Sequence, residues 1–235
     1  MSLPTLRLAV IGDGKMGRAV ASLADEHGFE VVALLGEAQL AVRGVTKELL
    51  DAADVAIEFT VPRAAAAHVR ACVTHGVPVI CGTTGWDDER GALSNEVLAA
   101  NGALLWAPNF SIGVHVFTRL VEQAARLVTS ANAGFDAHLV ETHHAAKLDA
   151  PSGTARLLAE RAARSLGHPL PTTSVRTGNV PGTHEVVFDA AFEQITLTHL
   201  ARDRRVFAAG ALAAARWIVG RHGVFTLDHL LGTAE

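Results

Sequence analysis

Several features that would point to particular environments are scarce or absent in this 235-residue sequence. It has two cysteines, Cys72 and Cys81, and no Cys-x-x-Cys pair, which argues against a disulfide scaffold and fits a reducing cytosol. The formal net charge is −4, so no basic field favours nucleic acid. No apolar run approaches the roughly 20 residues that cross a bilayer, and the N-terminus lacks a signal-peptide pattern. We therefore expect a cytoplasmic protein that binds neither nucleic acid nor a membrane.

Hydrophobic residues make up 49% of the sequence, and in the first half they form short runs separated by helical patterns. The run at residues 6–11 is apolar except for Arg7, as is typical of a strand buried on both faces. We expect further strands at 30–35, 54–60, 78–81 and 103–107, and helices after the first strand and at 62–75 and 86–100. This alternation over short links indicates a parallel sheet covered by helices on both faces.

The pattern changes after Asn109. A long helix is expected at 114–128, a strand at 135–142 and a helix from Ser152 to near Gly167. Strands at 174–178, 184–189 and 193–200 follow without helices between them, which indicates a smaller α+β domain with an open mixed or antiparallel sheet. An alanine-rich helix at 207–219 is expected to return to the first domain. The predicted domains are residues 1–108 with 207–235, and residues 109–206.

A glycine-rich turn follows the first strand and opens a helix. It reads Gly12, Asp13, Gly14, Lys15, Met16, Gly17, a complete G-x-G-x-x-G that predicts dinucleotide binding. The first glycine allows the tight turn, the second lets a pyrophosphate approach the backbone, and the third lets helix and strand pack closely. An ordinary turn is the alternative.

Glu37 lies near the end of the second strand, where an acid would bind the ribose hydroxyls of the cofactor. The basic Lys15 and Arg18 flank the phosphate turn, and a basic partner would suit a 2′-phosphate. The choice between NADH and NADPH therefore stays open.

Two further loops follow the fourth and fifth strands, where open α/β sheets bind ligands. The small Gly82 and the hydroxyls of Thr83 and Thr84 could border a flat ring. Asn109 can donate and accept hydrogen bonds at once, which suits a carboxamide. Ordinary loops are the alternative for both segments. We interpret Cys81 as a buried strand residue rather than a nucleophile.

The segment from Glu141 to Ala155 concentrates the polar chemistry of the chain. His143 and Lys147, four residues apart, could each donate a proton that cancels the charge left by hydride addition. Ser152, Gly153 and Thr154 open a helix, whose N-terminal N–H groups can hold an anion. Together with Lys147 they would suit a small dicarboxylate substrate. The alternatives are a chance His143–His144 pair and a simple turn at Asp149.

This segment resembles the signature of the dihydrodipicolinate reductases, the 4-hydroxy-tetrahydrodipicolinate reductases of lysine and diaminopimelate synthesis. The pattern is Glu141-x-His143-His144-x-x-Lys147-x-Asp149-Ala150-Pro151-Ser152-Gly153-Thr154-Ala155. Weaker matches extend over nearly the whole chain, at residues 12–17, 58–60, 82–85, 109–113, 176–184 and 207–211.

The resemblance implies a Rossmann-like parallel-sheet domain for the dinucleotide, and a second domain that binds substrate and forms a homotetramer. The reaction would be NADH- or NADPH-dependent reduction of a cyclic dipicolinate precursor. His143 and Lys147 would be the proton-donating pair, and His144, Lys147, Ser152, Gly153 and Thr154 would hold the substrate carboxylates. The cofactor would contact residues 12–17, Glu37, Gly82, Thr83, Thr84, Ala107, Pro108, Asn109 and Phe110.

The chain departs from the family pattern in ways that bear on cofactor preference. The stretch between Glu37 and Asp51 is short, the phosphate turn lacks a residue common in the family, and Gly36 stands where many members have the acid. A less selective cofactor site is one hypothesis, and matched kinetics with both cofactors would test it.

Three rival functions share parts of the pattern. An imine or aldehyde reductase would keep the glycine turn but would not need the dicarboxylate site. A zinc hydrolase could use Glu141, His143, His144 and Asp149, but the spacing fits no common ligand pattern and Lys147 is an unsuitable cationic neighbour, so we predict no metal. A nucleotide sensor without catalysis would not need His143, Lys147 and the anion site.

Overall fold

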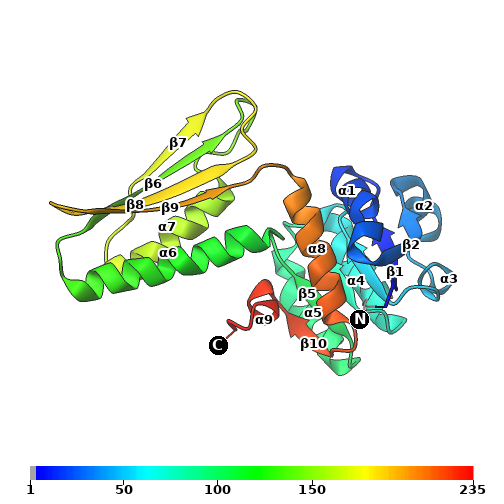
Figure 1. Ribbon diagram of the computed structural model, residues 1–235. Coiled ribbons are helices and arrows are strands. Elements are labelled where there is room, and N and C mark those ends of the chain that lie inside the picture. The colour runs from blue at the N-terminus through cyan, green and yellow to red at the C-terminus, as the bar shows by residue number, and fades with distance from the viewer. Residues whose placement is uncertain (1–3, 235) are drawn as a thin grey trace. The chain divides into compact units, whose positions relative to one another are not determined.

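The computed structural model describes residues 4–234 and divides the chain into two compact units (Figure 1). Unit 1 comprises the chain up to Ser111 together with the residues from Arg205 onward, and unit 2 is Ile112–Arg204. The predicted domain boundaries lie close to this division. No helix among residues 4–234 combines the length and apolar character needed to cross a bilayer.

Unit 1 is built on a six-stranded sheet in which every paired strand is parallel. Its order is β10-β5-β4-β3-β1-β2, so the chain passes to one side of β1 to form β2 and then to its other side to form β3. The strands are β1 Leu6–Ile11, β2 Phe29–Leu35, β3 Val55–Glu58, β4 Val79–Cys81, β5 Ala103–Trp106 and β10 Gly223–Phe225.

Helices cover both faces of this sheet because successive strand side chains point to opposite sides. Leu8 and Val10 of β1 pack with α1 Lys15–Leu23 and α8 Arg205–Ile218 in one core. Ala9 and Ile11 pack with α4 Pro62–Thr74 and α5 Asp87–Ala99 in the other. The predicted parallel sheet with two covered faces is confirmed, as is the return of the last long helix to the first unit.

Short elements complete unit 1, and the sequence pattern did not predict them. They are α2 Glu37–Arg43, α3 Lys47–Leu50, α9 Leu227–Leu230 and strand β10, whereas the 3₁₀ helix Asp25–His27 lies within the helix expected to run to about His27. Segments of three to seven residues are too short to show a helical or strand period, which explains the omission.

Unit 2 contains a four-stranded mixed sheet of order β7-β6-β8-β9. The strands are β6 Asp136–His143, β7 Thr172–Arg176, β8 Thr183–Asp189 and β9 Gln194–Leu200. β6 pairs in parallel with β7 and antiparallel with β8, and β8 pairs antiparallel with β9. The predicted mixed sheet is therefore confirmed.

Within residues 112–204, helices lie on one face of this sheet (Figure 1). These are α6 Ile112–Ala131 and α7 Gly153–Leu166. Ala137 and Leu139 of β6 contribute to the core under them. The α7 helix begins where the Ser152 side chain accepts a hydrogen bond from the N–H of Ala155, and it ends at Gly167 in a left-handed conformation.

Candidate active site

In unit 1 the predicted cofactor residues gather at one edge of the sheet. Because all six strands run in parallel, their carboxyl ends meet at the same edge, where open α/β sheets bind ligands. The turn at residues 12–17 follows β1, Glu37 follows β2, residues 82–84 follow β4 and residues 107–110 follow β5. Sequence reasoning and chain topology thus select the same edge.

The glycine turn has the geometry that its sequence predicts. A Cβ on Gly12, which has φ +107°, would lie 2.1 Å from the carbonyl oxygen of Phe59, and one on Gly17 would lie 1.8 Å from the carbonyl oxygen of Gly12. Apart from Gly14 and its two chain neighbours, no described residue has an atom within 4 Å of a Cβ placed on Gly14. Gly12 and Gly17 are therefore required for packing, whereas Gly14 leaves room for a ligand at the start of α1.

Asp13 of the glycine turn lies next to Gly36, at the end of β2. A Cβ on Gly36 would lie 2.9 Å from the carboxylate carbon of Asp13, so a side chain at position 36 would displace this carboxylate. Glu37 is exposed at the first position of α2. The Arg18 guanidinium donates to the backbone oxygen of Asp13 over 2.6 Å.

A buried carboxylate supports the loop after β4. Glu58, fully buried, accepts hydrogen bonds from the Thr60 hydroxyl and from Cys81 Sγ at 3.1 Å. Burial opposes its charge, but hydrogen bonds from His68, Thr60 and neighbouring groups hold the pKa of Glu58 below its usual value. Thr83 Oγ1 accepts from the Thr60 N–H at 2.8 Å. This network fixes the loop, and the expectation that Cys81 is a buried strand residue is confirmed.

Some of the remaining predicted residues of unit 1 are buried and others are exposed. Gly82 packs against Phe59, since a Cβ there would lie 1.9 Å from the ring, and Phe59 meets Phe110 edge to face. Asn109 Oδ1 accepts from the Ser111 N–H at 2.8 Å, a turn that precedes α6. Ala107 and Phe110 are buried, whereas Thr84 and Pro108 are exposed.

In unit 2 a cluster of polar side chains lies on the face of β6 that packs against the helices. Residues two apart on a strand share a face, so Glu141 and His143 follow Ala137 and Leu139 on the side that packs against the helices. Glu141 is fully buried and His143 is 8% exposed. A buried charge is costly unless it is paired, so the surroundings of Glu141 decide the character of this site.

The Glu141 carboxylate accepts hydrogen bonds from groups on several different elements. Oε1 accepts from Arg176 of β7 at 2.6 Å and from the backbone N–H of Ser152 at 3.3 Å, and Oε2 contacts His143 Nδ1. Desolvation would raise the pKa of Glu141, but hydrogen bonds from Arg176, Ser174 and His143 hold it at about 2. Glu141 is therefore an ionised, acceptor-only group.

The predicted proton donors are His143, the last residue of β6, and Lys147, in the loop that follows. Burial lowers the pKa of His143, and the neighbouring Glu141 opposes this shift. Lys147 Nζ donates to Asp149 Oδ1 at 2.7 Å. The Arg176 guanidinium also donates to the backbone oxygen of Asp149 at 2.6 Å, which ties the loop before α7 to the Glu141 carboxylate.

The predicted anion site is the first turn of α7, whose N–H groups point out of the helix end. Ser152 itself is 2% exposed, and its N–H and Oγ are engaged by Glu141, Ala155 and His184. Gly153 is exposed and Thr154 is half-buried. The backbone at Gly153 is thus the most accessible part of the predicted carboxylate site.

His184 of β8 joins the cluster from the other neighbouring strand. It pairs in register with Glu141, and its ring lies 5.2 Å from the His143 ring in an edge-to-face arrangement. Burial lowers the pKa of His184 to about 4, so the imidazole is neutral at pH 7. Its Nδ1 has no hydrogen-bond partner among the described residues.

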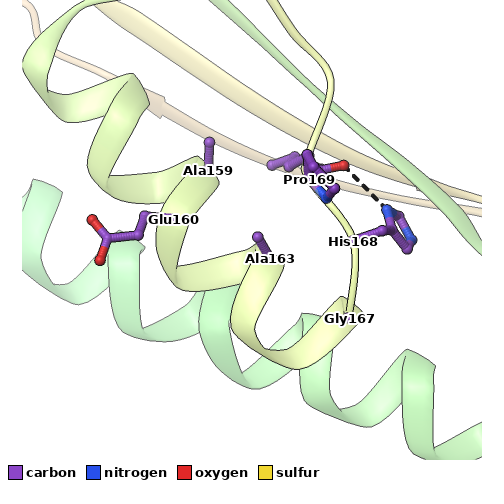
Figure 2. Close-up of a pocket in the computed structure, with 7 residues that line it drawn as sticks. Ala159, Glu160, Ala163, Gly167, His168 and Pro169 are labelled. Carbon is purple, nitrogen blue, oxygen red and sulfur yellow. Dashed lines mark hydrogen bonds between the residues drawn. The ribbon is translucent and has the colours of Figure 1, made fainter.

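His144 faces a separate hollow of about 470 Å³. Its Nε2 lies 3.1 Å from the Arg204 guanidinium. The hollow is lined by His144, Asn179, Pro181, Arg202, Asp203 and Arg204. A second hollow of about 510 Å³ lies between the end of α7 and the chain after Gly167, and it contains none of the predicted site residues (Figure 2).

The structure groups Glu141 and His143 with His184 rather than with His144 and Asp149, the set considered for zinc. Arg176 contacts the Glu141 carboxylate directly, so a cation entering this group would meet a fixed positive charge. The prediction that the site holds no metal stays a prediction.

Sequence reasoning missed the roles of Glu141, Arg176 and His184. Glu141 could have been linked to His143 by their spacing of two residues on a strand. Arg176 and His184 are register partners of His143 and Glu141 on the two neighbouring strands, and strand register is not visible in a single sequence.

The parallel sheet with its glycine turn, joined to a second unit with a smaller mixed sheet, defines an oxidoreductase of the two-domain dehydrogenase and reductase class. Residues 6–110 match the family model described as dihydrodipicolinate reductase, N-terminus, and residues 113–231 match dihydrodipicolinate reductase, C-terminus. The chain belongs to the dihydrodipicolinate reductase family, and the resemblance seen in the sequence is confirmed.

Individual relatives agree over almost the full chain. A 4-hydroxy-tetrahydrodipicolinate reductase of Laribacter hongkongensis is 35% identical over 97% of this chain and 98% of that protein. One of Stenotrophomonas maltophilia is 42% identical over 94% and 95%. A dipicolinate-bound dihydrodipicolinate reductase from Paenisporosarcina sp. TG-14 shares the fold, with a TM-score of 0.78 and 24% identity over 94% and 97% of the two chains.

Proposed function

We propose that the protein reduces 4-hydroxy-tetrahydrodipicolinate to tetrahydrodipicolinate, a step of lysine and diaminopimelate biosynthesis, with NADH or NADPH as the reductant. The observation that carries this proposal is the family match across both units, which includes relatives named for this reaction. The intact segment from Glu141 to Thr154, organised around one buried carboxylate, supports it independently.

Unit 1 would hold the nicotinamide cofactor. The open space at Gly14, next to the N-terminus of α1, fits a pyrophosphate, and the packed Gly12 and Gly17 fit the turn that such a site needs. Residues 12–17, Glu37, Gly82, Thr83, Thr84 and 107–110 would make the contacts. A bound reduced nicotinamide would supply the hydride. Exposed Glu37 favours a cofactor with a free 2′-hydroxyl, whereas Lys15 leaves a 2′-phosphate acceptable.

Unit 2 would bind the substrate and supply the proton. Lys147, His144 and the first turn of α7 from Ser152 to Thr154 would hold the two carboxylates, because cations and helix N-terminal N–H groups both stabilise anions. His143 and Lys147 would form the proton-donating pair that cancels the charge left by hydride addition. We further propose that residues 109–206 form the contacts of a homotetramer and that the enzyme is cytoplasmic.

Loss of reduced-nicotinamide absorbance with freshly made 4-hydroxy-tetrahydrodipicolinate tests the reaction, with NADH and NADPH run in parallel. Consumption with either cofactor is expected. A folded protein that binds cofactor but consumes none would overturn the substrate assignment and favour an imine reductase.

Two variants test the assigned roles. Lys147→Ala should lose most turnover and weaken substrate binding, whereas Arg164→Ala, which removes an exposed cation from α7, should change neither. His143→Ala should lower kcat by about 10²-fold or more while leaving cofactor affinity intact. An equal loss of cofactor affinity would mean that His143 is misplaced.

A further inference from the structure

The buried Glu141 has no direct part in the chemistry proposed above, yet it contacts the proposed proton donor. We infer that Glu141 is a positioning residue that fixes the imidazole of His143 with a proton on Nδ1, so that Nε2 is the nitrogen that gives its proton to the substrate. This inference rests on the proposed role of His143.

The hydrogen bond between Glu141 and His143 can run in one direction only. An ionised carboxylate can only accept, so the contact between Glu141 Oε2 and His143 Nδ1 requires a proton on Nδ1. The ionisation of Glu141 is secured by Arg176 at 2.6 Å and by the Ser152 N–H at 3.3 Å. In its neutral form His143 must therefore carry its proton on Nδ1 and a free electron pair on Nε2.

The Nε2 atom of His143 lies beside Gly182. A Cβ placed on Gly182 would lie 3.0 Å from this nitrogen, so the absence of a side chain at Gly182 keeps the ring edge clear. The other charged or titratable groups around the ring are Lys147, Arg176 and His184. Lys147 and Arg176 disfavour a positive charge on His143, and Glu141 is the group that favours it.

His143 gives up one proton and keeps the other during the transfer. When Nε2 is also protonated, the ring is an imidazolium with one proton held by Glu141. Transfer breaks the Nε2–H bond and forms a bond from that hydrogen to the atom that gained the electron pair. The neutral Nδ1–H ring remains, without rotation or exchange of tautomer, and Nε2 is then reprotonated from solvent. Glu141 keeps its charge throughout and offsets the cost of the buried imidazolium.

Glu141→Gln tests the inference, with Glu185→Gln as the matched control, because Glu185 lies on the neighbouring strand β8 and pairs with Val140 on the opposite face of the sheet. Glu141→Gln should lower kcat by about 10- to 100-fold, part of what general acid catalysis contributes. Activity should fall with rising pH as the acid deprotonates, and this alkaline limb should move to lower pH when Glu141 loses its charge. Glu185→Gln should leave both unchanged.

Imidazole nitrogen NMR of the wild-type enzyme, with the His143 signal assigned by comparison with His143→Gln, gives a readout independent of turnover and of any folding defect in the variant. The neutral Nδ1–H tautomer is expected. A Nε2–H tautomer, or an active Glu141→Gln enzyme with an unmoved alkaline limb, would refute the inference. A wild-type enzyme that fails to consume the substrate would instead refute the proposed function, whichever tautomer is seen.

Discussion

Acid should destabilise unit 2 through His184. This side chain is 4% exposed and its pKa is lowered from 6.5 to about 4, first by burial and then by the neighbouring His143. A base that resists protonation in the folded state binds fewer protons than it does in the unfolded chain. The free energy of unfolding therefore falls as the pH drops from about 6.5 towards 4.

The size of the effect follows from the shift. One pKa unit corresponds to about 1.4 kcal/mol, so the lowering from 6.5 to about 4 costs about 3 kcal/mol once the pH is below both values. At pH 5 the expected loss is about 2 kcal/mol. That is a large fraction of the stability of an ordinary domain. His143 and His199, whose pKa values are also lowered, add losses of the same sign.

His184→Gln isolates the contribution of this residue, because its amide can still reach Ser152 but does not titrate. Hydrogen exchange of peptides from β6, β8 and α7, measured at pH 7.5 and 5 and corrected for intrinsic rates, reports on unit 2. The variant should lose about 2 kcal/mol less than the wild type over this interval. All three tryptophans, Trp86, Trp106 and Trp217, belong to unit 1, so their fluorescence during urea unfolding serves as a control.

Equal losses in wild type and variant would refute the reasoning, because they would show that His184 is not the group that resists protonation. A changed fluorescence transition in the variant would show that the substitution acts outside unit 2.

Other expected outcomes concern the cofactor and substrate sites. Gly12→Ala should destabilise unit 1 by about 1–3 kcal/mol, because its Cβ would overlap the Phe59 carbonyl, whereas Gly14→Ala should keep stability and weaken cofactor binding. Tryptophan-detected urea unfolding and cofactor titration check this pair, and equal destabilisation would contradict it. Glu37→Gln should raise the KM for NADH more than that for NADPH, since a ribose acceptor is lost, and parallel changes would remove Glu37 from the site. Gly182→Ala should lower kcat without loss of cofactor affinity, because the new methyl group presses on His143 Nε2; kinetics equal to wild type would show that the loop yields freely.

Much of the fold was predictable because its strands are either mostly apolar or alternate between apolar and polar residues. The run at 6–11 became β1 without change of bounds, and the helix beginning at Pro62 begins there in the structure. By contrast, α2 and α3 lie in the short stretch after Glu37, and β10 is only three residues long. β10 forms because β5 pairs with it, and α3 is held by the buried Leu50, and local periodicity records neither contact.

The candidate site was predictable in its members but not in its connections. The spacing within residues 141–155 indicated proton donors and an anion site on one short segment. It did not indicate that Ser152 would turn its N–H inward to Glu141, or that Arg176 would reach both Glu141 and the Asp149 carbonyl. The Arg176 contacts depend on which residues of β7 stand beside β6, and the Ser152 contact depends on where the start of α7 packs, and both are tertiary features.

The discontinuous build of unit 1 has a consequence for synthesis on the ribosome. Unit 2 is one continuous segment, whereas one face of the unit 1 sheet is covered by α8, whose Ala208, Ala211 and Leu212 are fully buried. The strands β1 to β5 emerge first, together with α1, which packs on the same face, but the part of this face under α8 stays open until the last 30 or so residues have been made. The nascent chain therefore exposes part of an apolar sheet face until α8 has been made, and a chain that stops at Arg204 would leave that part uncovered.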